Sequence, residues 1–403
     1  MFSNIPNTMF VSLLLGILLL DFVPFFGNCQ KPADSGITIQ VYQFQYANGS
    51  TVTNTNNVNP SGQPQPTQTN SPPNQNGNIP PPQAPPIVPK PGDYMFEVSF
   101  SPFTSYKDGQ PTPQDIKYML KVIQSKFHFI FTNTMGVPDA QYSGQLDNEF
   151  PESLISRLAA QVNQESKSAS IKVCQGARIF KTGQGQKDLD YALDASRVAN
   201  AMLQGTVWGI SLNVDNQWGS IQDADDISHV HSILQQGYVK KAHELGLKVG
   251  VKLDICSEIV DGLNKDKIGE MVKSCDFVSC FVFPPRATES PMDGIASIAR
   301  IYQKYKQAFL KVNPNLEVII ETGWASSGES DFNPEHFNTV EKQREFWERM
   351  ESTAKENGMK VRMLEAFDEP TSKKELYRHF GFWKKATNTN GYIEKGTGKI
   401  VRM

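Results

Sequence analysis

A carboxylate ends an apolar run in the C-terminal part of the chain. Val318, Ile319 and Ile320 are followed by Glu321, and Trp324 stands three residues further on. A carboxylate at the end of a buried strand is placed to act as a nucleophile or a base, and an aromatic ring beside it can stack on the face of a sugar. The alternative roles of Glu321 are to cap the next helix or to pair with an arginine.

Apolar strands and amphipathic helices alternate from residue 94 onward. The spacing of apolar residues predicts strands at 95–103, 127–134, 171–177, 206–216, 247–255, 275–285, 316–324 and 359–369. It predicts helices at 113–126, 150–165, 187–203, 227–245, 265–272, 293–312, 334–357 and 372–385. Strands of this apolar composition are covered on both faces, which indicates a parallel sheet. Eight such units favour a (β/α)8 TIM barrel over a doubly wound open sheet, and no Gly-rich phosphate turn follows the first strand.

The chain divides into three segments. Residues 1–29 hold an apolar run at 9–20 that is typical of a signal peptide, although an uncleaved membrane anchor is the alternative. Residues 30–93 are rich in Pro, Asn and Gln and predict a disordered stalk. Residues 94–403 form the predicted barrel. We therefore expect a secreted protein without stable membrane insertion after cleavage of the signal.

Five cysteines are present, and an oxidising compartment would permit a disulfide. Cys256 and Cys280 are predicted to lie on neighbouring strands and are the favoured pair. Free buried thiols are the alternative.

Composition excludes several classes of function. The net charge of −3 gives no basic excess for nucleic acid. His229 and His231 lie two apart on a predicted helix and so face different sides, which argues against a metal site. We expect no cofactor and a monomer.

Three stretches together resemble one family of enzymes. They are IIETGWASSG at 319–328, MLEAFDEP at 363–370 and ELYRHFGFW at 375–383. They are similar to the corresponding motifs of glycoside hydrolase family 17, the β-1,3-glucanases, and look closer to the fungal and bacterial members than to the plant ones. The resemblance implies a (β/α)8 barrel, a retaining mechanism and a β-glucan as the partner.

The resemblance also assigns the reacting groups. It implies that Glu321 is the nucleophile and that Asp215 stands where the family has its Glu acid/base, with Val214 in place of the preceding Asn. Asp is shorter than Glu by one methylene, and a misplacement of about 1 Å can lower a rate about 10²-fold. The acid/base motif is therefore divergent.

Other positions agree with the family or depart from it. Phe281 stands where the family tends to have an Asn, and residues 129–133 lack its usual Arg and Tyr. The remaining substrate-binding candidates include the strand-eight carboxylates, a lysine shortly after them and a tryptophan shortly after Asp215. They are Trp324, Glu369, Asp368, Glu365, Lys373 and Trp218.

Two functions follow from these residues. The first is a secreted glycoside hydrolase that acts on β-1,3-glucan with two carboxylates at a doubtful rate. The second is a catalytically impaired barrel that binds a glycan or a protein, because polar positions on three strands have become apolar and a site loses discrimination when such groups vanish.

Overall fold

The computed structural model describes most of the predicted barrel. The described residues are 94–102, 111–135, 151–166, 171–179, 187–214, 220–263, 265–285, 288–328, 338–370, 375–387 and 391–402. The predicted signal peptide and stalk lie outside them. Among the described helices, none combines the length and apolar character needed to cross a bilayer.

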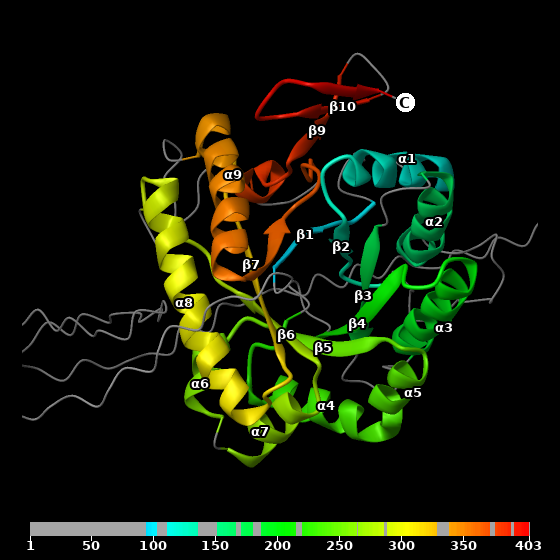
Figure 1. The fold of residues 1–403 in the computed structure, drawn as a ribbon, viewed down its shortest axis with the longest axis vertical. Helices are drawn as coiled ribbons and strands as arrows, with labels where there is room; N and C mark the ends of the chain where they lie inside the picture. Colours follow the sequence, from blue (N-terminus) through cyan, green and yellow to red (C-terminus); the bar gives the residue numbers. More distant parts are fainter. Residues whose placement is uncertain are drawn as a thin grey trace, which may run out of the picture. The chain divides into compact units, whose positions relative to one another are not determined.

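Eight parallel strands close into a barrel (Figure 1). They pair in sequence order, and β1 closes the ring on β8 through Met95 opposite Lys360. This confirms the (β/α)8 barrel and excludes the open sheet. The strands are β1 Met95–Ser99, β2 Phe129–Phe131, β3 Lys172–Ile179, β4 Val207–Val214, β5 Lys248–Leu253, β6 Phe277–Phe281, β7 Glu317–Gly323 and β8 Lys360–Leu364.

Helices surround the barrel, as Figure 1 shows. Several begin at side-chain caps: Thr112 caps α1, Asp223 caps α4 and Ser290 caps α8. The helices are α1 Pro113–Gln124, α2 Pro151–Ser166, α3 Lys187–Met202, α4 Ala224–Ile233, α5 Val239–Glu244, α6 Cys256–Asp261, α7 Asp266–Lys273, α8 Pro291–Val312 and α9 Val340–Asn357.

The predicted helix at 227–245 is interrupted. A π-helical turn, η2 Leu234–Tyr238, separates α4 from α5, and Gly237 within it has a φ of 82°. A positive φ is accessible to glycine at little steric cost, so the single predicted helix becomes two.

The prediction of an eighth helix at 372–385 is wrong for residues 375–385, which the structure describes. A short 3-10 helix, η4 Glu375–His379, is followed by a three-stranded antiparallel sheet, β9 Trp383–Lys385, β10 Gly391–Glu394 and β11 Ile400–Arg402. The sheet packs on α1, where the Tyr118 hydroxyl donates to the Val401 carbonyl at 2.7 Å. This C-terminal sheet takes the place of the helix because Trp383 and Tyr392 bury large rings there.

A disulfide joins Cys256 to Cys280. The favoured pairing is therefore confirmed, although Cys256 begins α6 rather than lying on a strand. Cys174 and Cys275 are free and buried.

Side chains alternate between the barrel interior and the surrounding helices. Val98, Val251 and Ile320 belong to the large core under the helices. Phe131 and Phe277 belong to a separate cluster inside the barrel. Because neighbouring residues on a strand point to opposite faces, residues one position away from the outer core face the barrel axis.

Glu152, in the first turn of α2, makes the free energy of unfolding of the protein depend on pH. Burial, reinforced by the charge of Asp188, raises the pKa of Glu152 from 4.5 to about 7. The folded protein then binds more protons than the unfolded chain between these values, so stability falls as pH rises through this window. The shift corresponds to at most about 3 kcal/mol.

We expect Glu152→Gln to flatten this dependence. Urea unfolding between pH 4.5 and 7.5 measures it, with Glu356→Gln, an exposed position on α9, as the matched control. An unchanged slope in Glu152→Gln would contradict the prediction.

Candidate active site

Glu321 lies in the C-terminal half of β7 and faces the barrel interior. Its carboxylate is completely buried. Lys252 Nζ, from β5, lies 2.9 Å from Oε1, and Arg362 Nη1, from β8, lies 3.3 Å from Oε2. Ser279 Oγ, from β6, donates to the same Oε2 at 3.4 Å. Side chains from three other strands thus converge on this one carboxylate of β7.

Arg362 connects this carboxylate to a second one. Its Nε donates to Glu97 Oε1, from β1, at 2.5 Å, and its Nη1 donates to Ser279 Oγ at 3.0 Å. The guanidinium carbon also lies 3.5 Å from the ring centroid of Phe131. Arg362 and Glu97 are both fully buried. The interior network, defined as Glu97, Lys252, Glu321 and Arg362, therefore crosses the barrel.

Opposite charges balance within the interior network. Burial by itself would lower the pKa of Arg362, but Glu97 and Glu321 outweigh it and the pKa is raised. Burial lowers the pKa of Lys252 despite the opposing pull of Glu321. Two carboxylates and two cations sum to zero charge when ionised, which is how a low-dielectric interior tolerates them.

Aromatic rings enclose the interior network. Lys252 Nζ lies 4.4 Å from the ring centroid of Phe281 and 5.4 Å from that of Phe131. With cations on two sides and rings beside them, Glu321 has no exposed surface. A nucleophile must touch the anomeric carbon of its substrate, whereas Glu321 is fully buried in this structure.

The partner carboxylate predicted on the fourth strand cannot be placed. Asp215, Trp218 and Lys373 all lie outside the described residues. Within β4, Asn213 is buried, and its side chain donates to the Asn133 carbonyl at 2.5 Å. Sequence reasoning passed over Asn213, which is the last described polar side chain of that strand.

Carboxylates do gather at the end of β8, as predicted. Glu365 and Glu369 are both partly exposed. Burial, followed by the charges of Glu369 and Asp368, raises the pKa of Glu365 well above its usual range. Burial also raises the pKa of Glu369. These groups hold protons more tightly than free carboxylates, which is the property of a general acid.

Asp368 is tied to the C-terminal sheet by a buried lysine. Lys395 Nζ donates to Asp368 Oδ1 at 2.7 Å, to Ser326 Oγ at 2.8 Å and to the His379 carbonyl at 3.0 Å. Its side chain is 4% exposed, and burial lowers its pKa against the pull of Asp368. Asp368 thus links the end of β8 to the C-terminal sheet.

Trp324 does not form a sugar platform. Its side chain is only 2% exposed, and its ring packs 5.5 Å from that of Phe346 on α9. After Gly323 the chain leaves β7 and turns the indole under the helices. The expectation of a stacking face at Trp324 is therefore wrong.

Other aromatic side chains are partly exposed at the C-terminal end of the barrel. Phe281 and Phe283 stack with centroids 6.1 Å apart, and Tyr377 stacks on Phe380 at 6.0 Å. Burial and then the charge of Asp254, which follows β5, raise the pKa of Tyr377. We call Phe281, Phe283, Tyr377 and Asp254 the mouth residues. They combine apolar faces with an exposed carboxylate.

Pairing with an arginine is one alternative role of Glu321 that the sequence suggests, and the structure shows that pairing with Arg362, but the sequence does not identify Arg362 or Lys252 as the partners. Lys252 lies in the run LKVGVKLDI and Arg362 in MKVRML, each as a charge with apolar residues directly on both sides. That pattern is a usable signal, because an inward charge in a closed barrel needs a partner. Across the described residues, no set of three or more His, Cys, Asp or Glu side chains is arranged to hold a metal.

Comparison with solved structures agrees with this architecture. No family model and no curated protein matches the chain. A glycoside hydrolase family 17 β-1,3-glucanosyltransferase from Rhizomucor miehei is similar at a TM-score of 0.50 and 16% identity, over 72% of this chain and 93% of that one. Its active-site mutant in complex with laminaritriose gives 0.52 and 15% over the same shares. The barrel has the fold of glycoside hydrolase family 17.

The family 17-like barrel departs from its predicted chemistry at identifiable side chains. Phe281, at the position where an Asn was expected, packs against the Lys252 ammonium. Phe131, on the strand that lacks the expected Arg and Tyr, packs against Arg362. The apolar replacements noted in the sequence therefore surround the interior network, where they shield it from water.

Proposed function

We propose that this protein is a β-glucan-binding barrel that does not hydrolyse its ligand by the retaining mechanism. The observation that carries this proposal is the complete burial of Glu321 between Lys252 and Arg362. Retaining hydrolysis needs a nucleophile that reaches the sugar and a second carboxyl about 5–5.5 Å away. Glu321 instead has a structural role, because its carboxylate compensates the buried positive charges of Lys252 and Arg362.

The mouth residues support binding of a saccharide. Phe281, Phe283 and Tyr377 offer rings to the apolar faces of sugars, and Asp254 offers an acceptor to hydroxyl groups. β-Glucan is the polymer that we propose, because the two similar structures are of a β-1,3-glucanosyltransferase, one of them in complex with laminaritriose.

Binding and turnover are measured on the same preparation. We expect laminarin to bind the wild-type protein by calorimetry and to release no reducing ends above background. Tyr377→Ala should weaken binding at least 10-fold, whereas Tyr377→Phe, which keeps the ring, should bind as the wild type does. Absence of laminarin binding in the wild type would overturn the proposal.

A second candidate is a slow retaining hydrolase. Burial raises the pKa of the partly exposed Glu369, which is the direction of shift that a general acid needs, and this favours the second candidate. In that mechanism Glu321 would be the nucleophile and Asp215 the acid/base. Release of reducing ends that disappears in Glu321→Gln would establish this candidate and remove the first.

The proposal includes secretion. The apolar run at 9–20 supports it. Expression in a eukaryotic host followed by N-terminal sequencing of the protein in the medium tests it, and retention of the intact chain in the membrane fraction would contradict it.

A further inference from the structure

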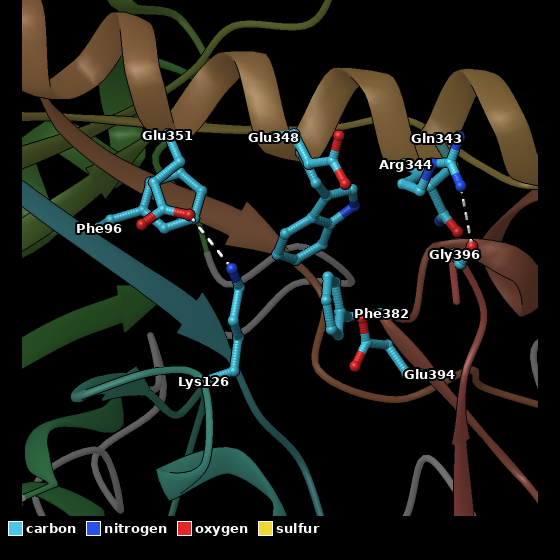
Figure 2. Close-up of a pocket in the computed structure, with 10 residues that line it drawn as sticks. Phe96, Lys126, Gln343, Arg344, Glu348, Glu351, Phe382, Glu394 and Gly396 are labelled. Atoms are coloured by element: carbon cyan, nitrogen blue, oxygen red, sulfur yellow. Dashed lines mark hydrogen bonds and ion pairs between the residues drawn. The ribbon is translucent and has the colours of Figure 1, made fainter. Parts of the chain in front are cut away.

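A hollow beside α9 is too small to hold a sugar unit. Its volume is about 50 Å³, whereas ligand pockets commonly measure about 300–1,000 Å³. Figure 2 shows the Lys126 ammonium reaching Glu351 in its lining, where the two form an ion pair at 3.3 Å. The hollow therefore belongs to the packing between α9 and its neighbours. The mouth residues, in contrast, have exposed or partly exposed side chains, so what holds them in place matters for binding.

Asp254, one of the mouth residues, lies in a two-residue segment that Cys280 holds at both ends. Before the segment, Leu253 of β5 is the partner of Cys280 in the last pair of the β5–β6 register. After the segment, Cys256 at the start of α6 forms the disulfide with the same Cys280. The strand ladder and the disulfide together thus fix the two ends of residues 254–255.

Two hydrogen bonds orient Asp254 within this segment. Its backbone N–H donates to the Ile221 carbonyl at 3.0 Å, and its carboxylate accepts from the Gln222 side-chain amide at 3.3 Å. Cys256 and Cys280 are 1% and 0% exposed, whereas Asp254 is exposed. The disulfide is therefore shielded from solvent, and the carboxylate that it borders is open to a ligand.

The disulfide bears on Asp254 more than on the neighbouring ring of Phe281. Phe281 follows Cys280 directly in β6 and pairs with Glu321 of β7, so the barrel itself fixes its position. Asp254 lies beyond the last β5–β6 pair. Given the proposed binding at the mouth residues, we propose that the Cys256–Cys280 disulfide is a positioning element that holds the Asp254 carboxylate in its ligand-binding orientation. A segment already held in its bound conformation binds more tightly, because less conformational entropy is lost on binding.

Calorimetric titration with laminarin tests the link between the disulfide and Asp254. We expect Asp254→Ala to weaken binding about 10-fold, as the loss of a hydrogen bond to a charged group does, and Cys256→Ala with Cys280→Ala to weaken it about 5-fold. In the Asp254→Ala background, removal of the disulfide should have no further effect, because the group that it positions is gone. The same loss in both backgrounds, or no loss in either, would overturn the inference.

Matched variants separate this role from a general loss of stability. Cys275→Ala removes a buried free thiol, and Asp261→Ala removes an exposed carboxylate of α6; both should bind laminarin as the wild type does. Ile259 of α6 is completely buried, so we expect the barrel to fold without the disulfide. If the double Ala variant does not fold, Cys256→Ala with Cys280→Val, which fills more of the volume, takes its place.

Amide hydrogen exchange at Asp254 reports on the segment without any ligand. The N–H that donates to the Ile221 carbonyl should exchange about 10-fold faster in the disulfide-free variant and at the wild-type rate in Cys275→Ala. Unchanged exchange in the disulfide-free variant would overturn this inference alone. Absence of laminarin binding in the wild type would instead overturn the proposed function, and with it the ligand role of the disulfide.

Discussion

Arg362→Met is expected to lower the free energy of unfolding by about 3–5 kcal/mol, the range for breaking a buried ion pair from one side. The substitution fills a similar volume but leaves Glu97 and Glu321 without the guanidinium that lies between them. Uncompensated carboxylates in a closed interior must either remain charged at high cost or take up protons. Urea unfolding at pH 7 measures the loss.

Two comparisons test the reason for this loss. Arg349→Met, on the exposed face of α9, removes an exposed pair with Glu345 and should change stability by less than about 0.5 kcal/mol. Adding Glu97→Gln to Arg362→Met should recover part of the loss, because one unpaired charge then disappears. The explanation fails if Arg362→Met is as mild as Arg349→Met.

Lys395→Met is expected to cost about 2–4 kcal/mol and to release the C-terminal sheet to proteases. The ammonium makes three hydrogen bonds, to Asp368, Ser326 and the His379 carbonyl, and Met can make none of them. The loss should be smaller than at Arg362, because the Asp368 side chain keeps 16% exposure and water can partly replace the lysine.

Thermal unfolding and limited proteolysis measure this change. Lys399→Met, an exposed position further along the same hairpin, is the matched control and should behave as the wild type does. Cleavage at 391–402 should appear in Lys395→Met alone. If Lys395→Met resists proteolysis as well as the wild type does, the aromatic contacts hold the sheet in place without the lysine.

The strands of the barrel could be predicted from the sequence because the apolar composition of each run indicates a strand that is buried on both faces. The sequence also predicted that Glu321 follows the apolar run 318–320 toward the C-terminal end of β7, which runs to Gly323. It did not predict that Glu321 is enclosed. Arg362 lies 41 residues further along the chain, and only the closure of the barrel brings the two together.

The local sequence pattern also gave wrong predictions where the same pattern is compatible with two different structures. Trp324 follows a strand end, and the pattern does not say whether the chain then turns the ring toward a ligand or under α9. Residues 383–385 fit a helical spacing but pair instead with β10, where Tyr392 lies opposite Lys385. Tertiary contacts decided both cases.

The neutral group of four charges sealed inside the ring has a consequence for behaviour on heating. The hydration free energy of ions becomes less favourable as temperature rises, so the penalty for keeping these groups dry shrinks in hot water, while the gain from apolar burial levels off. We therefore compare the wild type with a variant that has apolar residues at all four charged positions. The difference in their free energies of unfolding should change in favour of the wild type as the temperature approaches the melting point.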